Sequence, residues 1–136
     1  MKNRSFKNIS SAVAVVLILS VLLIILMCIL PRRLVLDLYD VCRPRLESAI
    51  EDVTANDNGS AFPKIENIVK AIEEKEKLLL LFYDHTDVSA LEGAAKTALE
   101  LARTDDPSQL ITELCEIGIR FEYLIHLNDI SIYNVF

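Results

Sequence analysis

Residues 12–30 read AVAVVLILSVLLIILMCIL, and only Ser20 and Cys28 interrupt a run of aliphatic side chains and one methionine. At a rise of about 1.5 Å per residue, a helix of this length covers most of the roughly 30 Å hydrocarbon core of a bilayer. The stretch therefore predicts a transmembrane anchor over residues 11–31. A short tail over residues 1–10 precedes the anchor, and residues 32–136 are left to form one small helical domain.

The end of the apolar run indicates that the anchor is retained. A signal peptidase acts on a shorter apolar region that is followed by small residues. Here the run is longer and ends in Leu30, Pro31 and Arg32, which offer no small residue at a cleavage position. We therefore expect an uncleaved signal-anchor.

Basic residues on both sides of the span bear on its orientation. Three precede the span and four follow it closely, so their number alone favours neither topology. They are Lys2, Arg4 and Lys7 before the span, and Arg32, Arg33, Arg43 and Arg45 after it. Because three charges and a free amine are costly to move across a bilayer, we expect a cytoplasmic N-terminus and an extracytoplasmic C-terminal domain at the plasma membrane.

The part of the chain after the span is strongly acidic. It carries all 20 acidic residues but only 11 of the 14 basic ones, which gives a net charge of −9. A surface of that sign repels nucleic acids and anionic lipid headgroups. We therefore expect no nucleic-acid partner for this domain, and membrane lipid only at the anchor.

Four amphipathic segments follow the span. Apolar residues recur at spacings of three and four in each segment, as on one face of a helix. The predicted faces are Val35, Leu38, Cys42, Leu46, Ile50 and Val53; Ile65, Ile68, Val69, Ile72, Leu79 and Phe82; Val88, Leu91, Ala95, Ala98 and Ala102; and Ile111, Leu114, Gly118, Phe121 and Ile125. Short connections join the segments, so the predicted fold is all-α, an N-terminal transmembrane helix followed by an up-down antiparallel four-helix bundle.

Proline and turn-forming residues predict the boundaries of these helices. Pro31 should break or kink the membrane helix, and Pro44 should kink the first helix of the bundle. Residues 54–60, TANDNGS, predict a loop. Asp106 and Pro107 have the form of an N-cap followed by the first residue of a helix.

The end of the fourth helix carries two further expectations. Gly118 in the middle of this helix costs up to about 1 kcal/mol relative to alanine, which predicts close packing at that position. Asn128 and Asp129 should end the helix. The apolar residues beyond them are expected to dock on the bundle; they are Ile130, Ile132, Val135 and Phe136.

Asp84, His85 and Asp87 form the one local cluster that could titrate or bind a metal. Crowding at a turn is unlike the ligand spacing of helical metal sites, so we expect a structural role. His85 would close the second helix, and Asp87 would cap the third. Ser89 and Glu92 also have capping-box form. No metal site is predicted, although His85, Asp87 and His126 remain candidate ligands because the second and fourth helices end on the same side of such a bundle.

Three cysteines are present, Cys28 in the span and Cys42 and Cys115 beyond it. Neither a C-x-x-C pair nor a Cys/His cluster supports a zinc site. Cys42 and Cys115 are a candidate disulfide if the domain is extracytoplasmic and their helices are neighbours. The other interpretation is that both are small buried apolar residues.

The second half of the chain resembles a known family. The residues concerned are EEKEKLLLLFYDHTDVSALEGAAKTALELARTDD and the ending ELCEIGIRFEYLIHLNDISIYNVF, with matches at Asp84, His85, Asn134 and Phe136. They resemble the domain-of-unknown-function family 4363, small membrane-anchored helical proteins of Gram-positive bacteria. The chain departs from that family in having no tryptophan. The resemblance implies an anchored helical protein of the cell envelope and no assigned activity.

Catalytic motifs are not found in the sequence. It has no G-x-S-x-G nucleophile motif, and its three glycines form no phosphate-binding loop. We therefore expect no enzyme and no cofactor. The first hypothesis is a protein-interaction or scaffold module whose partner is another envelope protein. The alternative is an extracytoplasmic sensor-like bundle that binds a small ligand or metal ion.

Overall fold

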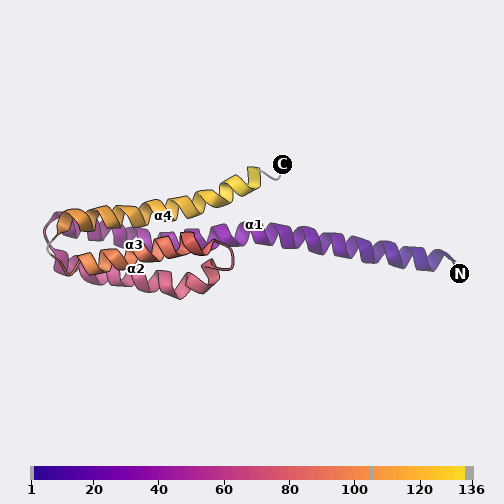
Figure 1. Ribbon diagram of the computed structural model, residues 1–136. Coiled ribbons are helices and arrows are strands. Elements are labelled where there is room, and N and C mark those ends of the chain that lie inside the picture. Colours follow the sequence, from indigo (N-terminus) through magenta and orange to yellow (C-terminus); the bar gives the residue numbers. More distant parts are fainter. Residues whose placement is uncertain (1, 105, 134–136) are drawn as a thin grey trace. The chain divides into compact units, whose positions relative to one another are not determined.

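The structure of the protein is a computed structural model that describes the backbone of residues 2–104 and 106–133 and the side chains of residues 12–104 and 106–127. The described residues form four α-helices and no strand (Figure 1). The helices are α1 (Lys2–Thr54), α2 (Asn58–Leu79), α3 (His85–Leu101) and α4 (Pro107–Tyr133). The prediction of an all-α fold is confirmed. The chain divides into two compact units, Met1–Leu30 and Pro31–Phe136.

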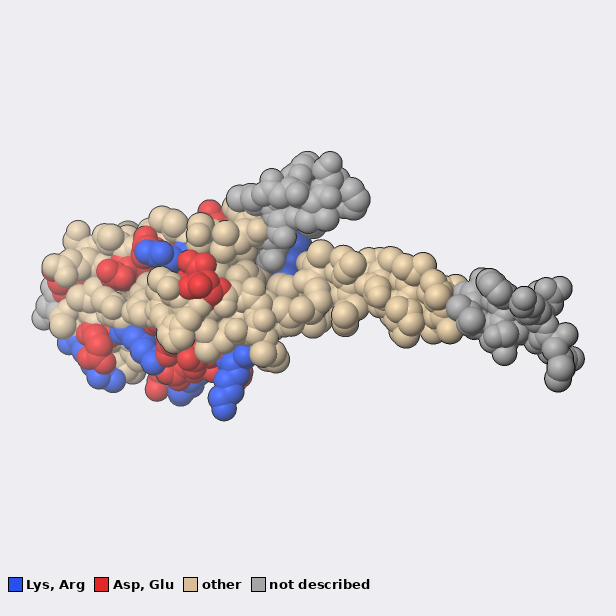
Figure 2. All heavy atoms as spheres, turned by 45° about the vertical axis from the view of Figure 1, so that its right-hand side comes forward, with Lys and Arg blue, Asp and Glu red and all other residues tan. Residues whose placement is uncertain are grey.

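The first unit contains the apolar part of α1, residues 12–30. Its large aliphatic side chains between Val13 and Leu30 are 44–67% exposed. An 18-residue window of this helix has a mean hydropathy of 3.5, so the helix is long and apolar enough to cross a membrane. The hydroxyl of Ser20 donates to the carbonyl oxygen of Val16 at 2.8 Å, which satisfies this polar group within the helix. Figure 2 shows no charged side chain in the described part of this unit.

The second unit is a bundle of the remaining part of α1 with α2, α3 and α4. Sequential helices run antiparallel and are joined by short connections (Figure 1), and side-chain contacts link neighbouring helices. Lys64 of α2 pairs with Asp52 of α1, and Lys96 of α3 lies 3.2 Å from Glu73 of α2. The rings of Tyr39 in α1 and Phe121 in α4 have centroids 5.3 Å apart. The up-down antiparallel bundle is confirmed, and the charged side chains of the described residues lie on this unit (Figure 2).

One contiguous core holds the bundle together, and most of the predicted faces supply it. The predicted residues of α3 are all buried, and those of α2 are buried except for Phe82, which is half-buried. In α4 the buried stripe lies at different positions from those predicted. Leu114 and Phe121 are buried as expected, but the other buried residues are Leu110, Ile117 and Leu124 rather than Ile111, Gly118 and Ile125.

The expected close packing at Gly118 is wrong. A methyl group built at this residue would meet no atom within 4 Å. The reason is the same change of face, since Ile117 points into the core and the glycine lies at its edge. Gly118 therefore marks no close helix approach.

Proline does not end a helix in this chain. α1 continues as a helix through Pro31 and Pro44, so the expected break at Pro31 is wrong. Each proline removes one backbone hydrogen bond, but the flanking residues keep theirs and hold the helix together. Asn128 and Asp129 also do not stop α4, which extends to Tyr133. The predicted docking of Ile130, Ile132, Val135 and Phe136 lies outside the described side chains.

The loop between α1 and α2 is shorter than predicted and spans residues 55–57. Asp57 caps α2, and its carboxylate accepts a hydrogen bond from the backbone N–H of Ser60 at 3.0 Å. Asn56 has a φ of 60°, a left-handed conformation that asparagine tolerates. Because the cap and the left-handed residue reverse the chain by themselves, residues 58–60 are free to begin the helix.

Two further N-caps position α3 and α4. The carboxylate of Asp106 accepts from the backbone N–H of Gln109 at 3.0 Å, and Pro107 is the first residue of α4, as predicted. The predicted cap of α3 is wrong, because Asp84 caps this helix and Ser89 lies within it. Asp84 precedes the helix in an extended conformation that lets its side chain reach the first free N–H groups.

Candidate functional site

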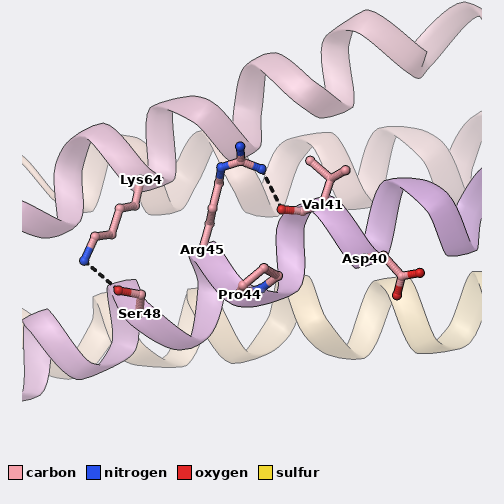
Figure 3. Close-up of a pocket in the computed structure, with 6 residues that line it drawn as sticks. All are labelled: Asp40, Val41, Pro44, Arg45, Ser48 and Lys64. Atoms are coloured by element: carbon pink, nitrogen blue, oxygen red, sulfur yellow. Dashed lines mark hydrogen bonds between the residues drawn. The ribbon is translucent and has the colours of Figure 1, made fainter.

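An open groove lies between α1 and α2 and holds about 550 Å³. It is lined by Asp40, Val41, Pro44, Arg45 and Ser48 of α1 and by Lys64 of α2 (Figure 3). We call it the α1–α2 groove. Pro44 has no backbone N–H to donate to the carbonyl group of Asp40, so the helix wall offers a carbonyl without its usual helical partner.

The cations of the α1–α2 groove are already engaged. The ammonium group of Lys64 donates to the hydroxyl of Ser48 at 2.7 Å and also pairs with Asp52. The guanidinium of Arg45 turns back along its own helix and donates to the carbonyl oxygen of Val41 at 2.6 Å (Figure 3). An incoming anion would have to compete with these bonds. Lys64 therefore links α2 to α1, and the groove is not arranged as a prepared anion site.

The thiol nearest this groove is unreactive. Cys42 is completely buried, and burial raises the pKa of its thiol to about 11 against a smaller opposing effect of Arg45. A thiol with this pKa stays protonated at neutral pH and is a poor nucleophile. Cys42 therefore serves as a small core residue.

The two cysteines of the candidate disulfide, Cys42 and Cys115, differ in exposure. Both cysteines are free, and whereas Cys42 is buried, Cys115 is exposed on α4. The interpretation of both as buried apolar residues is thus confirmed for Cys42 and wrong for Cys115. The change of face on α4 explains the difference, since the stripe through Leu114 places the next residue outside.

A second open groove, of about 330 Å³, lies between α3 and α4. Its lining residues are Asp87 of α3 and Glu116, Ile119, Arg120 and Tyr123 of α4, and we call it the α3–α4 groove. Ile119 is 58% exposed and Tyr123 is 48% exposed, one helical turn apart. The guanidinium of Arg120 donates to the carboxylate of Glu116 at 2.7 Å. Two apolar side chains thus stand on the surface beside a paired charge.

The side chains of Asp84 and His85 make hydrogen bonds at the start of α3. The carboxylate of Asp84 accepts from the backbone N–H of Thr86 at 2.7 Å, and the hydrogen bonds from Thr86 lower the pKa of Asp84. His85 begins α3, and its Nδ1 lies 2.8 Å from the hydroxyl of Ser89. The prediction that His85 closes the second helix is wrong, because α2 ends at Leu79 and His85 belongs to the next helix.

The candidate metal ligands do not form a ligand set in the described part of the chain. No group of three or more His, Cys, Asp or Glu side chains there is arranged to hold a metal ion. His85 bonds to Ser89, Asp87 lines the α3–α4 groove instead of capping α3, and His126 is exposed on α4. The three candidate ligands thus have different contacts and do not converge on one site.

Comparisons with known proteins give no match. No family model, curated protein or solved structure matches the chain.

Sequence reasoning missed the α3–α4 groove. Ile119 and Tyr123 are four residues apart and lie off the predicted apolar stripe, as they also lie off the observed one. A pair of large apolar residues at this spacing on the polar side of a helix is the signal that could have revealed the groove.

Proposed function

We propose that the chain is a single-pass protein of the plasma membrane whose helical unit binds another envelope protein and catalyses no reaction. The apolar part of α1 would be the uncleaved anchor. The N-terminal tail would stay in the cytoplasm, and the bundle would lie outside. The resemblance to family 4363 extends the proposal to the cell envelope of Gram-positive bacteria.

The exposed pair Ile119 and Tyr123 is the observation that carries this proposal. Exposed apolar side chains with a polar rim are typical of protein–protein contact sites. Tyrosine and arginine are enriched at such sites, and Tyr123 stands beside Arg120 in the α3–α4 groove. The groove is open and shallow, which suits the side chains of a partner better than an enclosed small molecule.

The charge of the bundle indicates the chemistry of the partner. Residues 32–136 have a net charge of −9, and the groove contains Asp87 and Glu116 with Arg120 as its one described cation. A partner with a positive surface would approach faster and would be favoured over an acidic one. We therefore propose a partner with a basic contact surface, whose binding weakens as salt is added.

The alternative function, a sensor-like bundle that binds a small ligand or metal ion, would use the α1–α2 groove. Its volume of about 550 Å³ is within the range of ligand sites. Against this, the groove is open to solvent, and Lys64 already bonds to Ser48 and Asp52. The contacts of Lys64 therefore favour the protein-binding function.

Site-specific photocrosslinking tests the proposal. A photoreactive amino acid replaces Ile119 in one variant of the full chain and Lys75 in another, since Lys75 is exposed on α2 away from the groove. After irradiation of intact cells, we expect a discrete adduct with another protein from position 119 and none above background from position 75. Adding Tyr123→Ala to the first variant should reduce the adduct, because it removes the second apolar side chain.

Three outcomes would contradict the proposal. They are equal adducts from positions 119 and 75, an adduct at position 119 with a second copy of this chain alone, and the absence of any adduct. The circular dichroism of each purified variant, compared with the parent chain, shows whether the fold is retained.

A further inference from the structure

The end of α2 and the turn after it expose a cluster of leucines. Leu78, Leu80 and Leu81 are 45%, 37% and 70% exposed. We call residues 78–82 the leucine turn. Adjacent exposed apolar side chains of this kind are typical of a protein or membrane contact site. It lies outside both grooves, so the proposed protein partner does not account for it.

The leucine turn is fixed to the bundle on both sides of its exposed residues. Leu79 is completely buried, and Tyr83 is buried to nine-tenths. The phenolic hydroxyl of Tyr83 donates to the carbonyl oxygen of Pro31 at 3.1 Å. Pro31 is the first residue of the second unit and follows directly on the apolar part of α1. The turn is therefore held at the residue where the chain enters the bundle from the span.

The backbone of the turn needs no water for its N–H groups. The N–H of Leu80 donates to the carbonyl of Glu76 at 2.9 Å, and that of Leu81 donates to Leu78 at 3.3 Å. The next two N–H groups, of Phe82 and Tyr83, both donate to the carbonyl of Leu79 at 3.0 Å and 2.9 Å. A segment that enters lipid must satisfy its backbone donors internally. The leucine turn meets this condition.

We propose that the leucine turn is a second membrane contact, which inserts into the interface of the bilayer at the end of the span nearest Pro31. The occupant is the lipid itself, since the apolar part of α1 keeps this end of the bundle at the membrane surface. Leu78, Leu80 and Leu81 enter the boundary between headgroups and acyl chains, as the apolar side of an interfacial helix does.

The charges around the turn are compatible with this contact. Arg32 and Arg33 follow Pro31 and are exposed, which suits the phosphate level of a bilayer. Lys75 and Lys77 offset Glu74 and Glu76 in the last turns of α2. The carboxylate of Asp84 is occupied by the N-cap of α3. Cationic side chains thus lie on both segments that meet at the leucine turn, the start of the second unit and the end of α2.

Tryptophan fluorescence in vesicles tests the proposal, because the parent chain contains no tryptophan. The L81W variant of the full chain is reconstituted in phosphatidylcholine vesicles with and without bromine on the acyl chains. The matched control is A55W, in the exposed turn at the other end of the α1 segment that begins at Pro31, about 35 Å away along the helix. L22W, within the span, is the positive control.

We expect brominated lipid to quench the emission of L81W and to leave A55W unchanged, because an interfacial side chain is buried about 5–10 Å into the boundary between headgroups and acyl chains. Quenching of L81W should not change as protein is diluted with lipid. Quenching of L81W no greater than that of A55W would overturn the proposal. A blue shift without quenching, or one that disappears on dilution, would overturn it too, because protein, such as a second copy of this chain, and not lipid would then cover the turn.

This inference rests on the span but not on the α3–α4 groove. If L22W is quenched and L81W is not, only the proposed membrane contact of the leucine turn is wrong, and the proposed protein-binding function stands. If L22W is not quenched either, the assignment of the apolar part of α1 as a membrane anchor is wrong. A negative crosslinking result at position 119 would leave the quenching of L81W unaffected.

Discussion

Replacing Phe121 by alanine should unfold the bundle more readily than any other single truncation in α4. Phe121 is completely buried and is the largest of the fully buried side chains. Its ring lies against that of Tyr39 at 5.3 Å with an interplanar angle of 35°, which joins α4 to α1. The substitution therefore removes both core volume and the ring contact between the first and last helices of the bundle.

The expected cost follows from burial. Removal of a fully buried phenylalanine costs about 3–5 kcal/mol, which includes the lost transfer free energy and the cavity that remains. The ring pair supplies about 0.5–1.5 kcal/mol of that amount. At roughly 4 °C or more per kcal/mol for a small domain, the melting temperature should fall by at least about 12 °C.

Thermal unfolding of the full chain in detergent, followed by far-ultraviolet circular dichroism, measures this change. The matched control is Tyr123→Ala, which truncates an exposed aromatic residue two positions along the same helix. Its effect should stay within about 0.5 kcal/mol. A melting temperature lowered no further by Phe121→Ala than by Tyr123→Ala would refute the assignment of the buried face of α4.

Three more results are expected. The hydrogen bonds from Thr86 lower the pKa of Asp84 below 3.8. The carboxylate therefore stabilises the fold fully above pH 3.8, and this stabilisation is lost as the pH falls through the lower pKa of the folded state. Asp84→Asn should flatten the acid side of a plot of melting temperature against pH. At neutral pH, mass spectrometry should find Cys115 alkylated in the folded chain and Cys42 alkylated only after unfolding, whereas protection of both until reduction would reveal a disulfide. Tyr83→Phe should lower the free energy of unfolding by about 1 kcal/mol in urea titrations because it removes the donor to Pro31, and an unchanged urea midpoint would contradict that hydrogen bond.

The sequence was sufficient for the fold class and for the faces of α2 and α3. In α2 the apolar residues from Ile65 to Leu79 are separated by charged ones, so only one face can be buried. In α4 the apolar residues come in adjacent pairs such as Leu110–Ile111 and Leu124–Ile125. Two neighbouring faces then fit the pattern equally well, and contact with the other helices decides between them.

Helix boundaries were less predictable because several residues could serve as caps. Asp84, Asp87 and Ser89 can all accept a hydrogen bond from a free N–H group, and the structure uses Asp84. Pro31 was expected to break or kink the helix, and the helix does not break there because the bonds of its neighbours maintain it. The sequence shows which residues are able to cap or break a helix. The packing of the bundle determines which of these residues occupies the capping position.

The surface features were the least visible in the sequence. The exposure of Ile119 and Tyr123 depends on which face of α4 is buried. The hydrogen bond from Tyr83 to Pro31 joins residues that are 52 positions apart, so no pattern of neighbouring residues could have predicted it. Both candidate contact surfaces therefore required the three-dimensional arrangement.

The central claim is that residues 12–30 cross the membrane once and leave the bundle outside. Its most direct test is labelling of intact cells with a membrane-impermeant maleimide. Cys115 should react in intact cells, whereas a cysteine introduced by Ser5→Cys in the N-terminal tail should react only after the cells are permeabilised. Labelling of the tail cysteine in intact cells while Cys115 stays protected, or recovery of the chain in the soluble fraction without detergent, would contradict the claim.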